Sequence, residues 1–201
     1  MALILKVEVD SIYIYPFGGI SKFKMPLNIH PIKELFILVT GPLFQIIAYY
    51  VLVFLMPQYK EIIKIYHIGI LYFNLLPIYP LDGGKLLALI LELFIPYKSS
   101  LKLTIYISYL IVIIIMIPSK ITLNLIIMGI FLLFTITKEH KKIKYIYNKF
   151  ILERYLNNYR FKKSRIINNY YSFYRNKRHL IKENNNYYLE KEYIKKIYNK
   201  V

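Results

Sequence analysis

The chain has 201 residues, of which 57% are hydrophobic, and it carries a formal net charge of +17. It contains no cysteine, which excludes a disulfide framework, a thiolate metal site and a cysteine nucleophile. The charge is uneven, because residues 1–136 carry a net +4 and residues 137–201 carry a net +13. An apolar front part is therefore followed by a basic, polar tail, a composition that also excludes an acidic disordered chain and a zinc finger.

Residues 1–30 predict a β-hairpin at the membrane surface. Apolar and charged residues alternate over residues 3–15, a Pro-Phe-Gly-Gly turn follows at 16–19, and a second short run covers 20–25. Period-two alternation with β-branched and aromatic residues on both sides of a turn is typical of a hairpin. Because a two-stranded hairpin alone is marginally stable in water, we expect it to lie against the membrane or the helices that follow.

Residues 31–137 predict a membrane domain with four spans. The apolar stretches are residues 35–56, 62–80, 101–117 and 121–137. A helix needs about 20 residues, within a range of roughly 17–25, to cross the hydrocarbon core. Residues 85–96 are apolar but too short to cross, so we expect a re-entrant or interfacial helix there. The expected fold class is a mainly α-helical, polytopic membrane protein with a small N-terminal β-hairpin.

Loop charge predicts a cell-membrane protein whose hairpin and tail both lie on the cytoplasmic side, where lysine and arginine accumulate. The opposite loops hold little more than Lys60, Lys64 and Lys120. The tail, residues 138–201, begins with apolar residues at helical spacing and ends with a short helical pattern. Its charge leaves three alternatives: contact with anionic lipid head groups, at about 1 kcal/mol per well-placed cation, a solvated extension, or, least favoured, RNA binding.

A string at the end of the second apolar stretch contains the most informative residues. It reads Asn-Leu-Leu-Pro-Ile-Tyr-Pro-Leu-Asp-Gly-Gly-Lys over residues 74–85. The prolines stop the helix and the glycines allow close approach. A carboxylate at this depth costs roughly 2.5–3.5 kcal/mol unless it is paired, hydrated or bound to a metal. Asp82 is therefore a candidate zinc ligand, although capping of the next helix is an equally good explanation from physics alone.

This string resembles the second signature of the site-2 proteases, which are intramembrane zinc metalloproteases, and most closely that of the stage IV sporulation protein FB group. Residues 15–20 are similar to the hairpin that precedes a span in that family, and residues 34–43 to the entry into that span. The resemblance covers roughly residues 5–156. It implies zinc as the cofactor and Asp82 as the third zinc ligand. The substrate-binding positions that it implies are Asn74, Pro80, Phe17, Gly18 and Gly19, the last three in a hairpin that could pair with an extended substrate.

The chain departs from the family at its first signature, H-E-x-x-H, which supplies two histidine ligands and a glutamate general base. The four histidines, at 30, 67, 140 and 179, include no pair at that spacing. His67 lies roughly four helical turns from Asp82, and His30 is a lone loop residue, so neither is a good substitute. Because a catalytic zinc needs three protein ligands, we assign no catalytic residue here and expect the family's N-terminal part to be missing.

The resemblance implies regulated intramembrane proteolysis of a membrane-anchored or membrane-associated protein, with this chain inactive on its own. The alternative is a non-catalytic pseudoprotease that keeps the substrate-binding hairpin and serves as a membrane scaffold. A transporter is disfavoured, because the apolar part holds one intramembrane carboxylate and no duplicated half.

Overall fold

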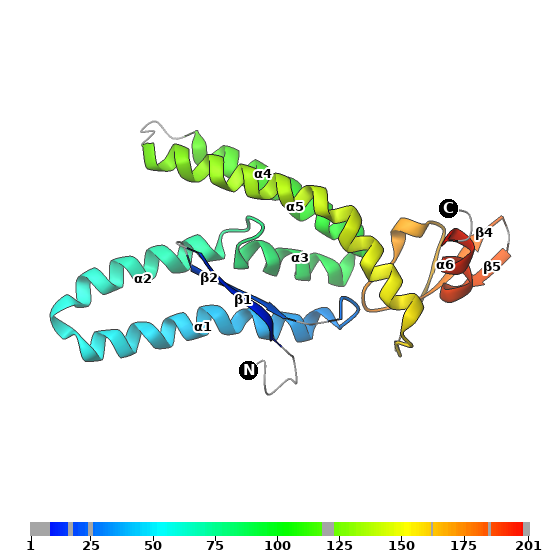
Figure 1. Ribbon diagram of the computed structural model, residues 1–201, viewed down its shortest axis with the longest axis horizontal. Helices are drawn as coiled ribbons and strands as arrows, with labels where there is room; N and C mark the ends of the chain where they lie inside the picture. Colours follow the sequence, from blue (N-terminus) through cyan, green and yellow to red (C-terminus); the bar gives the residue numbers. More distant parts are fainter. Residues whose placement is uncertain are drawn as a thin grey trace.

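The computed structural model describes residues 9–15, 18–23, 26–117, 123–161, 163–184 and 186–198. Its front part comprises strands β1 (Val9–Tyr15) and β2 (Gly18–Phe23) and helices α1 (Pro31–Leu55), η1 (Pro57–Tyr59), α2 (Lys60–Leu75), α3 (Asp82–Phe94), α4 (Tyr97–Met116) and α5 (Leu123–Leu156). Strand β3 (Ser164–Ile167), η2 (Tyr170–Ser172), β4 (Arg178–Glu183), β5 (Asn186–Leu189) and α6 (Glu190–Tyr198) follow. The long helices lie side by side, and the tail forms a compact unit at one end of them (Figure 1).

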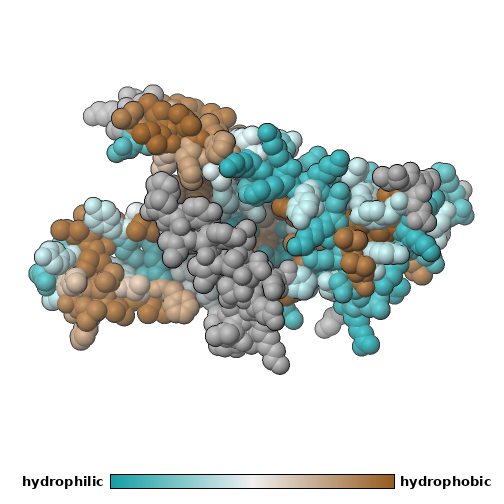
Figure 2. Space-filling model, in the orientation of Figure 1, coloured by the Kyte–Doolittle hydropathy of each residue, from teal (hydrophilic) through white to brown (hydrophobic). Residues whose placement is uncertain are grey.

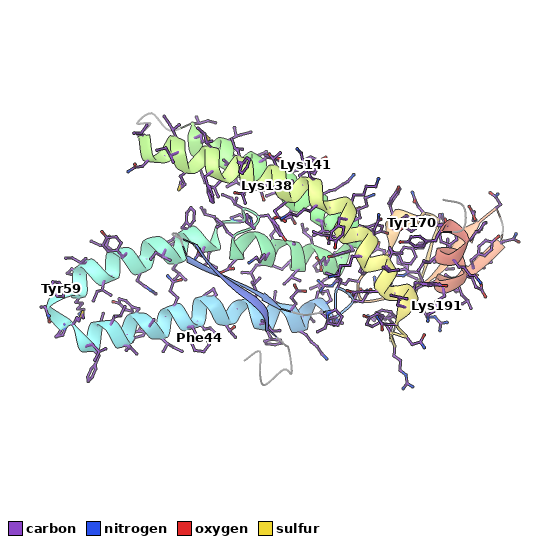
Figure 3. All side chains as sticks on the ribbon, viewed as in Figure 1. Phe44, Tyr59, Lys138, Lys141, Tyr170 and Lys191 are labelled. Atoms are coloured by element: carbon purple, nitrogen blue, oxygen red, sulfur yellow. The ribbon has the colours of Figure 1, made fainter. Side chains whose placement is uncertain are left out.

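Three helices of the described residues, α1, α4 and α5, are long and apolar enough to cross a membrane. Many large apolar side chains on these helices are exposed, and Phe54 near the end of α1 is 84% exposed. Figure 2 shows hydrophobic residues over α1, α2 and the far ends of α4 and α5, whereas the tail is largely hydrophilic. Tyr59 and Lys191, labelled in Figure 3, mark the end of the α1–α2 pair and the tail. This distribution supports the expected membrane location, since lipid is the solvent that apolar outer surfaces require.

The second predicted span, residues 62–80, is shorter than expected, because helix α2 ends at Leu75 and a loop leads from it to α3. Helix α2 has 16 residues, so four full-length spans are not found in the described part of the chain. Helices α2 and α3 both run antiparallel to α1: the Gln45 amide donates to the His67 carbonyl in α2 at 3.2 Å, and Gly41 lies against Asp82 in α3. The helix expected at residues 85–96 thus begins earlier, at Asp82, and continues the path of α2 along α1, because the prolines interrupt the helix without reversing its direction.

The predicted hairpin is confirmed in the described residues. Strands β1 and β2 pair antiparallel, from Tyr15 opposite Gly18 to Val9 opposite Phe23. Gly18 and Gly19 belong to strand β2 instead of the turn in which the sequence placed them. Residues 1–8, 16, 17, 24 and 25 lie outside the described residues, so the predicted position of Phe17 is not described.

The tail folds into a small α/β unit. Strand β3 pairs parallel with β4, and β4 pairs antiparallel with β5. The inner face of the sheet packs on α6 and the end of α5 in a core that includes Ile181, Phe173 and Ile194. The sequence predicted the two helical segments but no strands. The strands are short, and β4 buries only His179 and Ile181 among charged neighbours, too weak an alternation to identify from composition.

Candidate functional site

The segment between α2 and α3 brings the informative string beside the middle of α1. Ile78 is fully buried in a core formed mainly by α4 and α5. The backbone N–H of Tyr79 donates to the Ser108 hydroxyl of α4 at 2.8 Å, and the Tyr79–Pro80 peptide is cis. An N–H that has no helical partner is costly in a membrane unless it is satisfied in this way. Helix α4 therefore fixes the loop that precedes Asp82.

The two glycines after Asp82 allow α3 to begin directly against the backbone of α2 and the loop. A Cβ atom on Gly83 would lie 2.1 Å from the carbonyl oxygen of Leu75, and one on Gly84 would lie 2.4 Å from the backbone of Ile78. No side chain of any kind fits at those distances without a backbone shift. The Gly-Gly pair is thus required by close packing, and this packing sets the position of the adjacent carboxylate.

Asp82 is the first residue of α3, and its side chain is 32% exposed. One carboxylate oxygen is 3.4 Å from the Lys85 ammonium, and the other would lie 3.7 Å from a Cβ added at Gly41 of α1. The residue preceding the helix is Leu81, and no side chain caps the helix by a hydrogen bond. Capping of a helix that starts at Lys85, one of the two explanations offered by the sequence, is therefore wrong. The carboxylate remains favoured by the positive end of the helix dipole.

The other predicted substrate-binding residues fall into two groups. Asn74 lies in the last turn of α2 and Pro80 in the following loop, so both share the α2–α3 junction with Asp82. Gly18 and Gly19 lie in the separate two-stranded sheet, opposite Tyr15 and Ile14. Substrate binding by these residues stays a prediction.

The histidines do not assemble with Asp82. His67 stacks on the Tyr49 ring with centroids 4.6 Å apart, and His30 caps α1 by accepting from the Ile32 N–H at 3.3 Å. Among the described residues, no group of three or more histidine, aspartate or glutamate side chains could hold a metal ion. A carboxylate is a suitable zinc ligand, but three protein ligands are needed. The described residues do not by themselves provide the ligands that a catalytic zinc ion needs.

Sequence reasoning missed a buried ionic cluster at the other end of α3. Arg175 of the tail donates to Glu92 of α3 at 2.6 Å and also pairs with Glu34 of α1. Although burial opposes its charge, the carboxylates of Glu92 and Glu34 raise the pKa of Arg175 above its usual range. The available signal was Glu92 itself, because an acid in an otherwise apolar helix requires a cationic partner. Nothing in the sequence identified which cation that would be.

A comparison with curated proteins finds similarity to stage IV sporulation protein FB of Bacillus subtilis (strain 168), with 31% identity over 168 residues. The match covers 77% of this chain and 57% of the relative, so the chain spans little more than half of the relative's length. No family model matches the chain. Stage IV sporulation protein FB is a site-2 protease family member, and the similarity agrees with the family expected from the Asp82 string. The similarity supports assignment of the chain to the site-2 protease family.

Proposed function

We propose that the chain is the Asp82-bearing part of a membrane-embedded zinc metalloendopeptidase of the site-2 protease type, which carries out regulated intramembrane proteolysis. The observation that supports this most strongly is the placement of Asp82. Close backbone packing at Gly83 and Gly84 fixes the carboxylate at the first turn of α3, beside a glycine of α1 and next to an interruption in the helical path. The sequence similarity to stage IV sporulation protein FB supports the same kind of site.

In this proposal Asp82 supplies one oxygen ligand to zinc. The sequence holds no H-E-x-x-H, so the histidine ligands and the general base are proposed to come from a segment outside these 201 residues. Lys85 would leave Asp82 on metal binding, because a divalent cation competes with an ammonium group for the same carboxylate. The partly exposed ion pair is weak enough to be exchanged.

The proposed substrate is a membrane-anchored or membrane-associated protein. The substrate must be unwound or extended at the site, because the peptide groups of a helix are hydrogen-bonded to one another. An extended segment could add a strand to the two-stranded sheet of β1 and β2, and Gly18, Gly19 and Phe17 are the hairpin residues proposed to contact it. Asn74 and Pro80 would contact it at the α2–α3 junction.

We place the protein in the cell membrane as a multi-pass protein with the hairpin and the tail on the cytoplasmic side. Charge supports this orientation, because the apolar half of α5 ends where Lys138 and Lys141 begin its basic half (Figure 3). Lysines at that level suit anionic lipid head groups. Nucleic acid is not proposed as a partner.

A second candidate is a non-catalytic pseudoprotease that binds substrates or acts as a scaffold. Two observations favour it: the missing H-E-x-x-H and the contact of Asp82 with Lys85, which already satisfies one carboxylate oxygen. This candidate predicts no zinc binding in any context.

Metal content separates the two. We would express the chain with and without the segment encoded immediately upstream of Met1, reconstitute it in nanodiscs and measure zinc per protein and cleavage of a membrane substrate with and without chelator. The protease proposal expects zinc and chelator-sensitive cleavage only with the upstream segment, and loss of zinc in Asp82→Ala. The matched control is Glu61→Ala, which removes an exposed acid from the far end of α2. Zinc retained in Asp82→Ala, or bound by neither form, would contradict the proposal.

A further inference from the structure

The tail inserts one arginine between α1 and α3, the helix that begins with Asp82. Arg175 lies between η2 and β4 and its side chain is 4% exposed. Its guanidinium donates to the Glu92 carboxylate of α3 at 2.6 Å, to the Glu34 carboxylate of α1, and through Nε to the Leu27 carbonyl at 2.6 Å. These partners are 83, 141 and 148 residues away in sequence. One side chain thus joins three distant segments.

The two acids and Asp82 lie along the same contact between α1 and α3. Glu34 and Gly41 are seven residues apart on α1, which places them about two turns apart on the same face. Glu34 meets α3 through Arg175 at Glu92, and Gly41 lies against the Asp82 carboxylate. The ionic cluster therefore closes one end of the α1–α3 contact, and Asp82 stands at the other end.

Electrostatic repulsion between the two acids makes Arg175 necessary in this cluster. Glu92 is 2% exposed, and two carboxylates that bind the same guanidinium in a medium of low dielectric repel each other strongly when that cation is absent. Arg175 reverses this repulsion because its planar guanidinium reaches both carboxylates at once, a geometry that lysine cannot reproduce. Without the arginine, the same two acids would push α3 and α1 apart.

Arg175 is itself held by α5. The Arg154 guanidinium donates to the backbone carbonyls of Tyr174 and Arg175 at 2.6 and 3.2 Å, and it forms an ion pair with Glu190 of α6 at 2.8 Å. The segment that presents Arg175 is therefore fixed by the folded tail, and the position of α3 depends on that fold.

We infer that Arg175 is a positioning residue for Asp82: through Glu92 and Glu34 the folded tail holds α3 against α1 and so sets the distance between Asp82 and α1. The inference rests on the proposed function only in taking Asp82 as the functional residue of α3. The tail then contributes to the geometry of the site without contacting it.

Engineered cysteines can test this, because the natural chain has none. In the full chain in membranes, the pair Gly41→Cys with Asp82→Cys reports the α1–α3 contact by the rate of oxidative disulfide formation. The pair Tyr49→Cys with His67→Cys reports the α1–α2 contact and serves as the control. We expect Arg175→Gln to slow the first reaction by about fivefold or more, since it leaves two uncompensated acids, and the control reaction by less than about twofold.

A rescue variant separates positioning from general support of folding. Adding Glu92→Gln to Arg175→Gln removes one of the two facing charges and should return the 41–82 rate to within about twofold of the parent. An unchanged 41–82 rate in Arg175→Gln would overturn the inference. An equal fall in both cysteine pairs, or no recovery in the double variant, would do the same. The readout needs neither metal nor cleavage, so failure of the proposed function leaves this result interpretable.

Discussion

Replacing Gly83 by alanine tests whether close packing at the start of α3 positions Asp82. The added Cβ would lie 2.1 Å from the Leu75 carbonyl oxygen, whereas ordinary contacts begin at 3.4 Å. The first turn of α3 must therefore move by more than an ångström, and the obstacle is backbone, which cannot rotate away. Overpacking usually costs about 1–3 kcal/mol. We expect the free energy of unfolding to fall by about 3 kcal/mol, because no flexible side chain can absorb the strain.

Two other glycines provide matched controls for the same chemical change. A Cβ on Gly69 of α2 meets nothing within 4 Å, and one on Gly41 meets only the Asp82 carboxylate, at 3.7 Å. Gly69→Ala should stabilise the protein by about 0.5–1 kcal/mol through helix propensity, and Gly41→Ala should be nearly neutral. The contrast between the variants isolates steric packing from propensity.

Unfolding in mixed micelles by titration with a denaturing detergent, followed by far-ultraviolet circular dichroism, measures the free-energy differences. The rate of disulfide formation between cysteines at positions 41 and 82 then shows whether α3 has moved. If Gly83→Ala unfolded at the same detergent fraction as Gly69→Ala, the packing of α3 on the end of α2 would be wrong, and the steric account of Asp82 would fail with it.

Three further predictions address the loop and the tail. Ser108→Ala should destabilise the protein by about 1–3 kcal/mol by leaving the Tyr79 N–H unsatisfied, whereas Thr135→Ala, which removes a hydroxyl bonded only to its own helix, should cost less than about 0.5 kcal/mol in the same titration. Arg154→Ala should weaken the tail by about 3–5 kcal/mol, seen as faster proteolysis of the tail in the full chain. Burial lowers the pKa of His179 from its ordinary 6.5, so the neutral form stabilises the fold above that pH and the benefit is lost as pH falls toward the lower folded value. The hydrogen-exchange protection of β4, measured relative to the intrinsic exchange rate at each pH, should therefore fall on acidification in the parent but not in His179→Gln.

Much of the membrane part could be predicted from the sequence, because helix length and apolar composition are local properties. The stretch 101–117 corresponds to α4 within a few residues, and the stretch 35–56 to α1. Asp82 was identified for a related reason: a carboxylate between prolines and glycines in an apolar segment is conspicuous without any knowledge of the fold. These signals are contained in single windows of sequence.

The rest of the fold depends on contacts between residues that are far apart in the sequence, which no short sequence segment contains. Helix α3 could not be placed along α1, since an apolar segment of 13 residues is equally suited to an interfacial position. The strands of the tail are short and charged, and their pairing is decided by partners such as α6. The cation that would neutralise Glu92 lies 83 residues away, among eighteen lysines and arginines of the basic tail.

Polar contacts, more than apolar burial, determine where the α2–α3 path lies. Lipid chains and leucine side chains are similarly apolar, so sliding one helix along another in a bilayer changes apolar contact energy little. The path is instead fixed by three hydrogen bonds, one at each of three levels. They join the Gln45 amide to the His67 carbonyl, the Tyr79 N–H to the Ser108 hydroxyl, and the Arg175 guanidinium to the Glu92 carboxylate. Each of these contacts is lost by a shift of one residue. The position of Asp82, between the second and third of them, is therefore specified by hydrogen bonds together with the glycine packing, and one of these bonds comes from the tail.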